Sequence, residues 1–166
     1  MLRTRFSLKA LLTIVAVIAV ICAYCGRLRT LAGREYAAYH ELCELGAEGD
    51  DWISPKELIT GRPPIVQIRI PASIDPQVTM TLLPTLNNLE ALTLEYDTMT
   101  ANDMRVVESL SLRSLTFCGG FPTDDDIEQL SIFDTVPFLT LPAERLSDQS
   151  ISHLQELLPH TKLVLR

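Results

Sequence analysis

The sequence predicts an α/β protein in which one amino-terminal transmembrane helix precedes a short solenoid of strand–turn–helix units. Three observations support this fold class. Residues 10–25 carry no charged side chain and have basic residues on both sides. From Ile65 onward, apolar frames of the form L-x-x-L-x-L recur at a nearly constant period. Each complete frame is followed by apolar residues at helical spacing, so we expect parallel strands on a concave face and helices on a convex face.

The charges divide the 166-residue chain into two parts of opposite character. Residues 1–30 carry five basic side chains and no acidic ones, whereas residues 31–166 carry nine basic and all 21 acidic side chains. An acidic domain repels phosphate, which argues against a general nucleic-acid binder. A hydrophobic content of 47% excludes a disordered chain, and four cysteines in this length do not build a disulfide scaffold.

Residues 1–26 are interpreted as a tail and a transmembrane helix. The stretch from residue 8 to residue 26 holds nineteen positions with Lys9 as its only charge. A spanning helix needs about 20 apolar residues. Lys9 lies near one end, where its stem can reach the headgroups, and Tyr24 lies near the other end, where an aromatic residue suits the interface. We therefore expect residues 8–26 to have the lipid bilayer as their partner.

A cleaved signal peptide is the alternative for this leader, since it has the same basic and apolar parts. Cleavage favours small residues at both −3 and −1, and neither Cys22-Ala23 nor Cys25-Gly26 offers a clean A-x-A site. Basic residues flank both ends of the span, so the positive-inside rule sees nearly equal sides. We expect the amino terminus inside and the acidic domain outside, because a short leader resembles an export signal.

Residues 27–64 are expected to form a juxtamembrane helix and a connector. Apolar and aromatic residues recur at three- and four-residue spacings over residues 29–45, at Leu31, Tyr36, Tyr39, Leu42, Cys43 and Leu45. This spacing is typical of an amphipathic helix. Gly46 is a natural cap for its carboxyl end, and His40 is interpreted as a surface residue. The connector closes at the double proline of residues 63–64.

Residues 65–166 form a repeat domain with four repeats and a terminal strand. The central apolar positions of the frames are separated by 24, 23, 24 and 24 residues, and they are Ile68, Leu92, Leu115, Leu139 and Leu163. Further apolar residues lie 12, 15 and 18 positions after each of the first four, along one helical stripe. Thr100, Thr123 and Ser147 fall eight positions after a central residue, where a hydroxyl can cap the following helix. The first unit has Asp75-Pro76 instead.

This pattern resembles that of short bacterial leucine-rich repeat proteins with an N-terminal membrane anchor, whose unit reads roughly L-x-x-L-x-L-x-x-T-x-I-T-D-x-G-L-x-x-L. The best matches are Leu89–Val107 and Val136–Leu154, and residues 5–12 resemble the anchors found ahead of such domains. The third unit departs from the pattern at residues 119–122. The resemblance implies a curved solenoid with a binding role, and it supplies no catalytic residues.

The candidate binding face consists of residues that flank the inward leucines of the strands. It combines a row of threonines with one exposed aromatic residue and few charges, at Arg69, Thr93, Glu95, Ser114, Thr116, Phe138 and Thr140. Such a face suits a peptide or a protein. The alternative is that the threonine row only stabilises the strand ladder, since β-branched neighbours do so in any sheet.

The remaining chemistry-bearing residues predict no catalytic, cofactor or metal site. Three contiguous acids at residues 124–126, with Glu128, lack the alternate spacing of a calcium loop and suit a helix amino terminus. His153 and His160 lie two helical turns apart, too far to share a metal without other ligands. The sequence contains no nucleophile–base set, no glycine-rich phosphate loop and no evident site for a small-molecule substrate.

The function expected from these features is that of a membrane-anchored, non-enzymatic protein–protein interaction module. The alternative is a structural subunit whose short solenoid is completed by self-association or by another chain. Terminal repeats normally need caps. The amphipathic helix over residues 29–45 is the candidate for the amino-terminal cap, and Lys162 and Arg166 place charge on the final strand, which guards an open edge.

Overall fold

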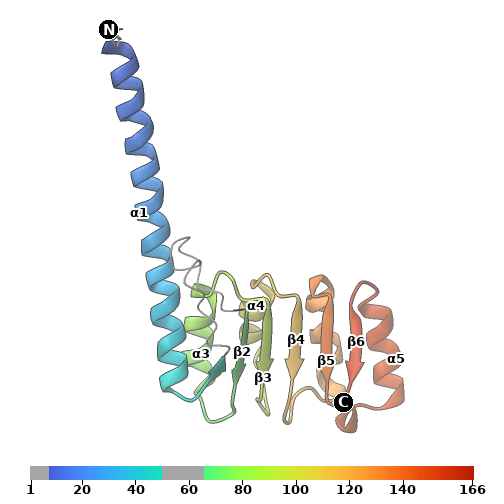
Figure 1. Cartoon of the computed structure of the whole chain (residues 1–166). Helices are drawn as coiled ribbons and strands as arrows, with labels where there is room; N and C mark the ends of the chain where they lie inside the picture. The colour runs from blue at the N-terminus through green and yellow to red at the C-terminus, as the bar shows by residue number, and fades with distance from the viewer. Residues whose placement is uncertain (1–7, 50–65) are drawn as a thin grey trace.

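The amino-terminal part of the chain is one continuous helix, α1 (Leu8–Glu44), which joins the expected transmembrane and juxtamembrane helices (Figure 1). The computed structural model describes residues 8–49 and 66–166. The side chains of residues 12–27 are exposed all around the helix, and by length and composition this helix can cross a membrane. The helix has 37 residues and is therefore about 55 Å long, longer than the hydrocarbon core of a bilayer.

Some predictions fall on residues outside the described ranges. These are the connector up to the double proline, the frame position Ile65 and the side chains before residue 12, among them Lys9.

Gly46 ends α1 as predicted. Its φ of 110° lies in the left-handed region, which glycine adopts without a steric penalty. The Gly46 N–H donates to the Cys43 carbonyl at 3.0 Å, and the Ala47 N–H donates to the Leu42 carbonyl at 2.9 Å. These two bonds form a Schellman motif, and the chain reverses direction immediately after it.

One six-stranded sheet follows, with its strands in chain order. The strands are β1 (Glu48–Gly49), β2 (Gln67–Ile70), β3 (Ala91–Leu94), β4 (Ser114–Phe117), β5 (Phe138–Leu141) and β6 (Lys162–Leu165). β1 pairs antiparallel with β2, and all later pairs are parallel. The five central positions from Ile68 to Leu163 are mutual partners across the sheet, so each period of the sequence forms one strand.

Helical segments connect the strands and cover one face of the sheet (Figure 1). They are α3 (Pro76–Leu82), η1 (Leu83–Thr85), α4 (Ala101–Glu108), η2 (Asp124–Thr135), η3 (Ala143–Arg145) and α5 (Asp148–Leu157). In the third unit the helix η2 is a 3₁₀-helix. Its buried residues Ile127, Leu130 and Phe133 are three positions apart. A spacing of three suits the 3₁₀ geometry as well as one stripe of an α-helix.

The predicted hydroxyl caps occupy the starts of three helices. Thr100 forms a capping box with Asp103, and Thr123 forms one with Asp126. The Ser147 hydroxyl accepts the Ser150 N–H at 3.2 Å. In the first unit the Asp75 carboxylate accepts the Gln77 N–H at 2.8 Å, so the different sequence there also caps its helix.

The carboxyl-terminal part of α1 covers the amino-terminal end of the core, as expected for residues 29–45. Ala38, Tyr39 and Leu42 are buried in the same cluster as the strand leucines. The predicted apolar stripe is nevertheless wrong in part, since Leu31, Tyr36 and Leu45 are 42%, 48% and 47% exposed. The buried face instead contains a charged residue, Glu35, which apolar periodicity assigns to the solvent.

Candidate functional site

The face of the sheet opposite the helices holds the seven residues predicted to bind a partner. Arg69, Thr93, Thr116 and Thr140 are register partners in one row. Ser114 and Phe138 are partners in the neighbouring row. The structure therefore brings six of the seven predicted residues together as two adjacent rows across β2 to β5, and Glu95 lies just after the end of β3.

Arg69 and Glu95 form an ion pair at the β2–β3 end of this face. The Arg69 Nε donates to Glu95 Oε1 at 2.6 Å, and its Nη2 also contacts this oxygen. Arg69 Nη1 lies 3.6 Å from Glu48 Oε2 on β1. The hydrogen bond that Arg69 donates to Glu95 raises the pKa of Arg69, which stays charged throughout the physiological range. The two predicted charges thus largely neutralise each other, and this end of the face is polar with little free charge.

Phe138 is the aromatic residue predicted on this face, and it is 47% exposed. Lys162 Nζ lies 5.9 Å from the centroid of its ring, which places an ammonium group over an aromatic face. Both residues are the first of their strands, β5 and β6. An exposed aromatic ring beside a cation therefore marks one corner of the sheet.

Thr140 is a correction to the predicted face, because it is only 9% exposed. Its register partners are Thr116 and Val164, and its neighbours along the same side of the strand are Phe138 and Pro142. The corresponding neighbours of Thr116 along its strand are the smaller Ser114 and Cys118. Larger flanking side chains account for the burial of Thr140, which removes it from the accessible surface.

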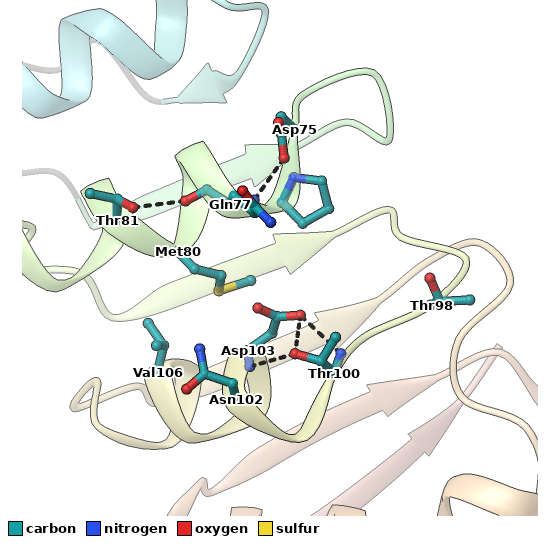
Figure 2. A pocket seen from close by; sticks show the side chains of 10 residues that line it. Asp75, Gln77, Met80, Thr81, Thr98, Thr100, Asn102, Asp103 and Val106 are labelled. Carbon is teal, nitrogen blue, oxygen red and sulfur yellow. Dashed lines mark hydrogen bonds between the residues drawn. The ribbon is translucent and has the colours of Figure 1, made fainter.

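A cleft of about 580 Å³ lies on the helical side of the molecule, between the first turns of α3 and α4 (Figure 2). Sequence reasoning did not find it. It is lined by Asp75, Pro76, Gln77, Met80, Thr81, Thr98, Thr100, Asn102, Asp103 and Val106. The departure from the repeat at Asp75-Pro76 was the one sequence signal that this turn differs from the others.

The carboxylates of this cleft are engaged in helix caps. Asp103 Oδ2 accepts the Thr100 N–H at 2.9 Å and its hydroxyl at 2.7 Å (Figure 2). Asp75 accepts the Gln77 N–H. Nearby, the buried Tyr96 hydroxyl donates to Thr79 Oγ1 at 2.7 Å, and burial raises the pKa of Tyr96. The cleft thus holds polar groups that already have partners, and it contains no pair of free carboxylates for acid–base chemistry among the residues that line it.

The acidic cluster at residues 124–126 acts in capping, as predicted, and also joins two units. Asp126 completes the capping box of η2. Asp124 accepts the Ser147 N–H at 2.8 Å, and this bond lowers the pKa of Asp124. His153 Nε2 lies 2.9 Å from Glu128 Oε1 of the preceding unit. His40, exposed as predicted, lies 3.4 Å from Glu44.

Glu35 is the polar residue whose role sequence reasoning missed. Its side chain is 2% exposed, and Oε1 accepts the Asn88 N–H at 2.9 Å. The Asn88 amide donates to both carboxylate oxygens at 3.1 and 3.0 Å. Burial raises the pKa of Glu35 more than these hydrogen bonds lower it. The contact fastens α1 to the loop before β3.

Within the described ranges, no group of three His, Cys, Asp or Glu side chains is placed to hold a metal ion. Comparisons of the chain with protein-family models, with curated proteins and with solved structures find no match. The function proposed below therefore rests on the residues and geometry of this chain.

Proposed function

We propose that the chain is a membrane-anchored leucine-rich repeat protein that acts as a non-enzymatic protein–protein interaction module. The in-register pairing of residues 24, 23, 24 and 24 positions apart carries this proposal, because one strand per period is how a repeat solenoid stacks its units. A helical segment follows each of β2 to β5, and its apolar side joins the common core.

The binding surface of this module is the face that bears Arg69, Thr93, Thr116 and Phe138. It is not covered by any described helix, and its side chains are mostly uncharged or paired with each other. Hydroxyls and an exposed aromatic ring suit contacts with another protein, since aromatic residues are enriched at such interfaces. The partner is another protein at the membrane or envelope.

The anchor is the apolar part of α1, with the amino terminus inside and the acidic domain outside. A carbonate wash of membranes tests the anchor. The full chain is expected to remain in the pellet, and a variant that lacks residues 1–26 is expected in the supernatant. Release of the full chain, or a shorter mature chain that begins after the span, would contradict an uncleaved anchor.

Photo-crosslinking in intact cells tests the binding face. A photoreactive amino acid replaces Thr116 on the face or, as the matched control, Gln155 on the exposed side of α5. A protein crosslinked at Thr116 and absent at Gln155 supports the proposal, provided that Thr93→Arg abolishes the crosslink. The same products at both positions, or none at Thr116, would contradict a binding role for this face.

A structural subunit completed by a second chain is the alternative, and the end of the sheet at β6 favours it. Leu165 is 39% exposed, whereas its register partner Leu141 is fully buried. A second chain placed against β6 would cover this surface. A third variant with the photoreactive amino acid at Val164 of β6 tests this alternative. A species of twice the chain mass at Val164 and not at Thr116 would favour it.

A further inference from the structure

The strands run in the same direction as α1. The chain reverses at Gly46 and enters β1, which is antiparallel to β2, so β2 to β6 run parallel to α1 (Figure 1). The loops that precede these strands therefore lie on the side from which α1 arrives. We call this edge the near rim, and the edge formed by the loops after the strands the far rim.

The two rims differ in charge. The far rim, with the first helical turns beside it, comprises residues 71–78, 95–103, 118–126 and 142–150. It carries nine acidic side chains and one basic. The near rim comprises residues 83–91, 106–114, 133–138 and 155–162. It carries four acidic side chains, two basic and His160. Acids favour helix amino termini, which explains their position. The consequence is a domain whose strongly acidic rim points away from the apolar part of α1.

The Glu35–Asn88 contact fixes the height of the near rim along α1. Glu35 comes nine residues after Gly26, the end of the apolar stretch, which is about 14 Å at 1.5 Å per residue. The headgroup layer on each side of a bilayer is about 5–8 Å thick. The near rim at Asn88 thus lies within about 10 Å of the headgroups when α1 stands upright.

An ordinary tilt of α1 that brings β6 toward the membrane closes this gap at the β6 end of the sheet. The centres of β2 and β6 are about 19 Å apart at 4.8 Å per strand. A tilt of about 20°, which is usual for membrane helices, moves the β6 end of the near rim about 7 Å closer to the headgroups. Exposed Arg113, Phe138 and Lys162 lie on the near rim toward this end. Arg113 pairs with Glu90 at 3.4 Å in a solvent-exposed contact, which is weak and easily exchanged for a phosphate.

We propose that the near rim rests on the headgroups of the bilayer that holds α1, with Arg113 and Lys162 on lipid phosphates and the Phe138 ring at the interface. The Phe138 ring then serves the bilayer contact, and the rest of the proposed binding face stays open to a protein partner. This inference rests on the proposed anchoring. It makes the tilt of α1 a property of the whole molecule. It also leaves the far rim, which has the larger excess of acidic side chains and is repelled more strongly by anionic lipid, directed into solvent.

Quenching of a single tryptophan tests this contact in the full chain. Phe138→Trp is made in a Trp52→Phe background, and Thr98→Trp on the far rim is the matched control. The proteins are placed in vesicles of phosphatidylcholine and phosphatidylglycerol that contain lipid with a spin label on its headgroup. Quenching is expected to be several-fold stronger at Phe138 than at Thr98. Adding Arg113→Glu is expected to reduce it by at least half, whereas Arg145→Glu on the far rim is expected to leave it unchanged.

Flotation of the same vesicles separates failure of the contact from failure of the anchor. Protein that floats with the vesicles but is quenched equally at both positions would overturn the rim contact and leave the anchor intact. Protein that does not float would overturn the anchoring itself. A circular dichroism spectrum unchanged by Arg113→Glu is required before its effect is assigned to lost lipid contact.

Discussion

The two ends of the sheet are finished in different ways. At the amino-terminal end, β1 pairs with β2, α1 packs against α3 and η1, and Leu42 of α1 is fully buried in the common core. At the other end, β6 is the last strand of the sheet, and Leu163 and Val164 are only partly buried. Lys162 and Arg166 there are exposed. One end is thus closed by packing, and the other carries exposed charges, which are expected to guard an accessible edge.

Leucine truncation gives the largest expected difference between the covered and open parts. Leu115→Ala removes a fully buried side chain at the centre and is expected to cost about 2–5 kcal/mol. Leu163→Ala, at the same position of the open strand, is expected to cost clearly less. Urea unfolding of the full chain in detergent, followed by circular dichroism, measures both. Equal costs would mean that β6 is covered in solution. Thr116→Ser is the control for the register, since a loss as large as that of Leu115→Ala would place the strand one residue out of register.

The Glu35 clamp, by which we mean the hydrogen-bonded contact of Glu35 with Asn88, is the next test of the covered end of the sheet. Glu35→Ala leaves the partly buried Asn88 donors without this acceptor, which is expected to cost about 1–3 kcal/mol. Glu41→Ala, at an exposed position of the same helix, is the matched control and is expected to change stability little. The same unfolding measurement applies. A cost no larger than that of Glu41→Ala would show that the clamp contributes nothing to docking of α1.

The pKa of Glu35 predicts how this clamp responds to pH. Because its pKa is raised in the folded state, the folded chain binds the proton more tightly than the unfolded chain. This contribution is fully present below the ordinary pKa of glutamate and is lost as pH rises through the raised value. The stability of the wild type minus that of Glu35→Gln should therefore fall over this interval. A difference that rises or stays constant would contradict the raised pKa.

Sequence predicts the features of this fold that repeat along the chain, and it misses those that depend on contacts between distant residues. The period fixed the strand register from Ile68 to Leu163, since apolar side chains repeat wherever a common core needs them. The burial of Glu35 was not predicted, because a charged residue in an amphipathic pattern is assigned to solvent and its partner, Asn88, is 53 residues away. The burial of Thr140 was not predicted either, because it depends on the size of the neighbouring side chains. The cleft needed the spacing between α3 and α4, which no local pattern records.

Removal of a helix cap is expected to lower stability less than the changes above. The effect is expected to be similar in each of the units at the middle of the sheet. Thr100→Ala removes the hydroxyl that accepts the Asp103 N–H and is expected to cost about 1 kcal/mol. Thr98→Ala, two residues before it and without a cap role, should be close to neutral. Thermal unfolding compares the pair. Similar midpoints for the two variants would show that the capping box adds no stability.

The charges at the open end are expected to affect association more than stability. Lys162→Val together with Arg166→Val removes the charges that flank the edge of β6, and self-association is expected to rise. Light scattering of the full chain in detergent measures this change, with Arg145→Val as the control. A variant that stays monomeric would show that something other than charge protects this edge.

The claim that α1 completes the core is tested most directly by the thermal unfolding midpoints of two fragments. Residues 27–166 keep the docked part of α1, and residues 48–166 lack it. Removal of Ala38, Tyr39 and Leu42 from the core is expected to lower the midpoint clearly or to cause aggregation. A lower midpoint for residues 48–166 is the result that the account predicts, and equal midpoints would contradict it.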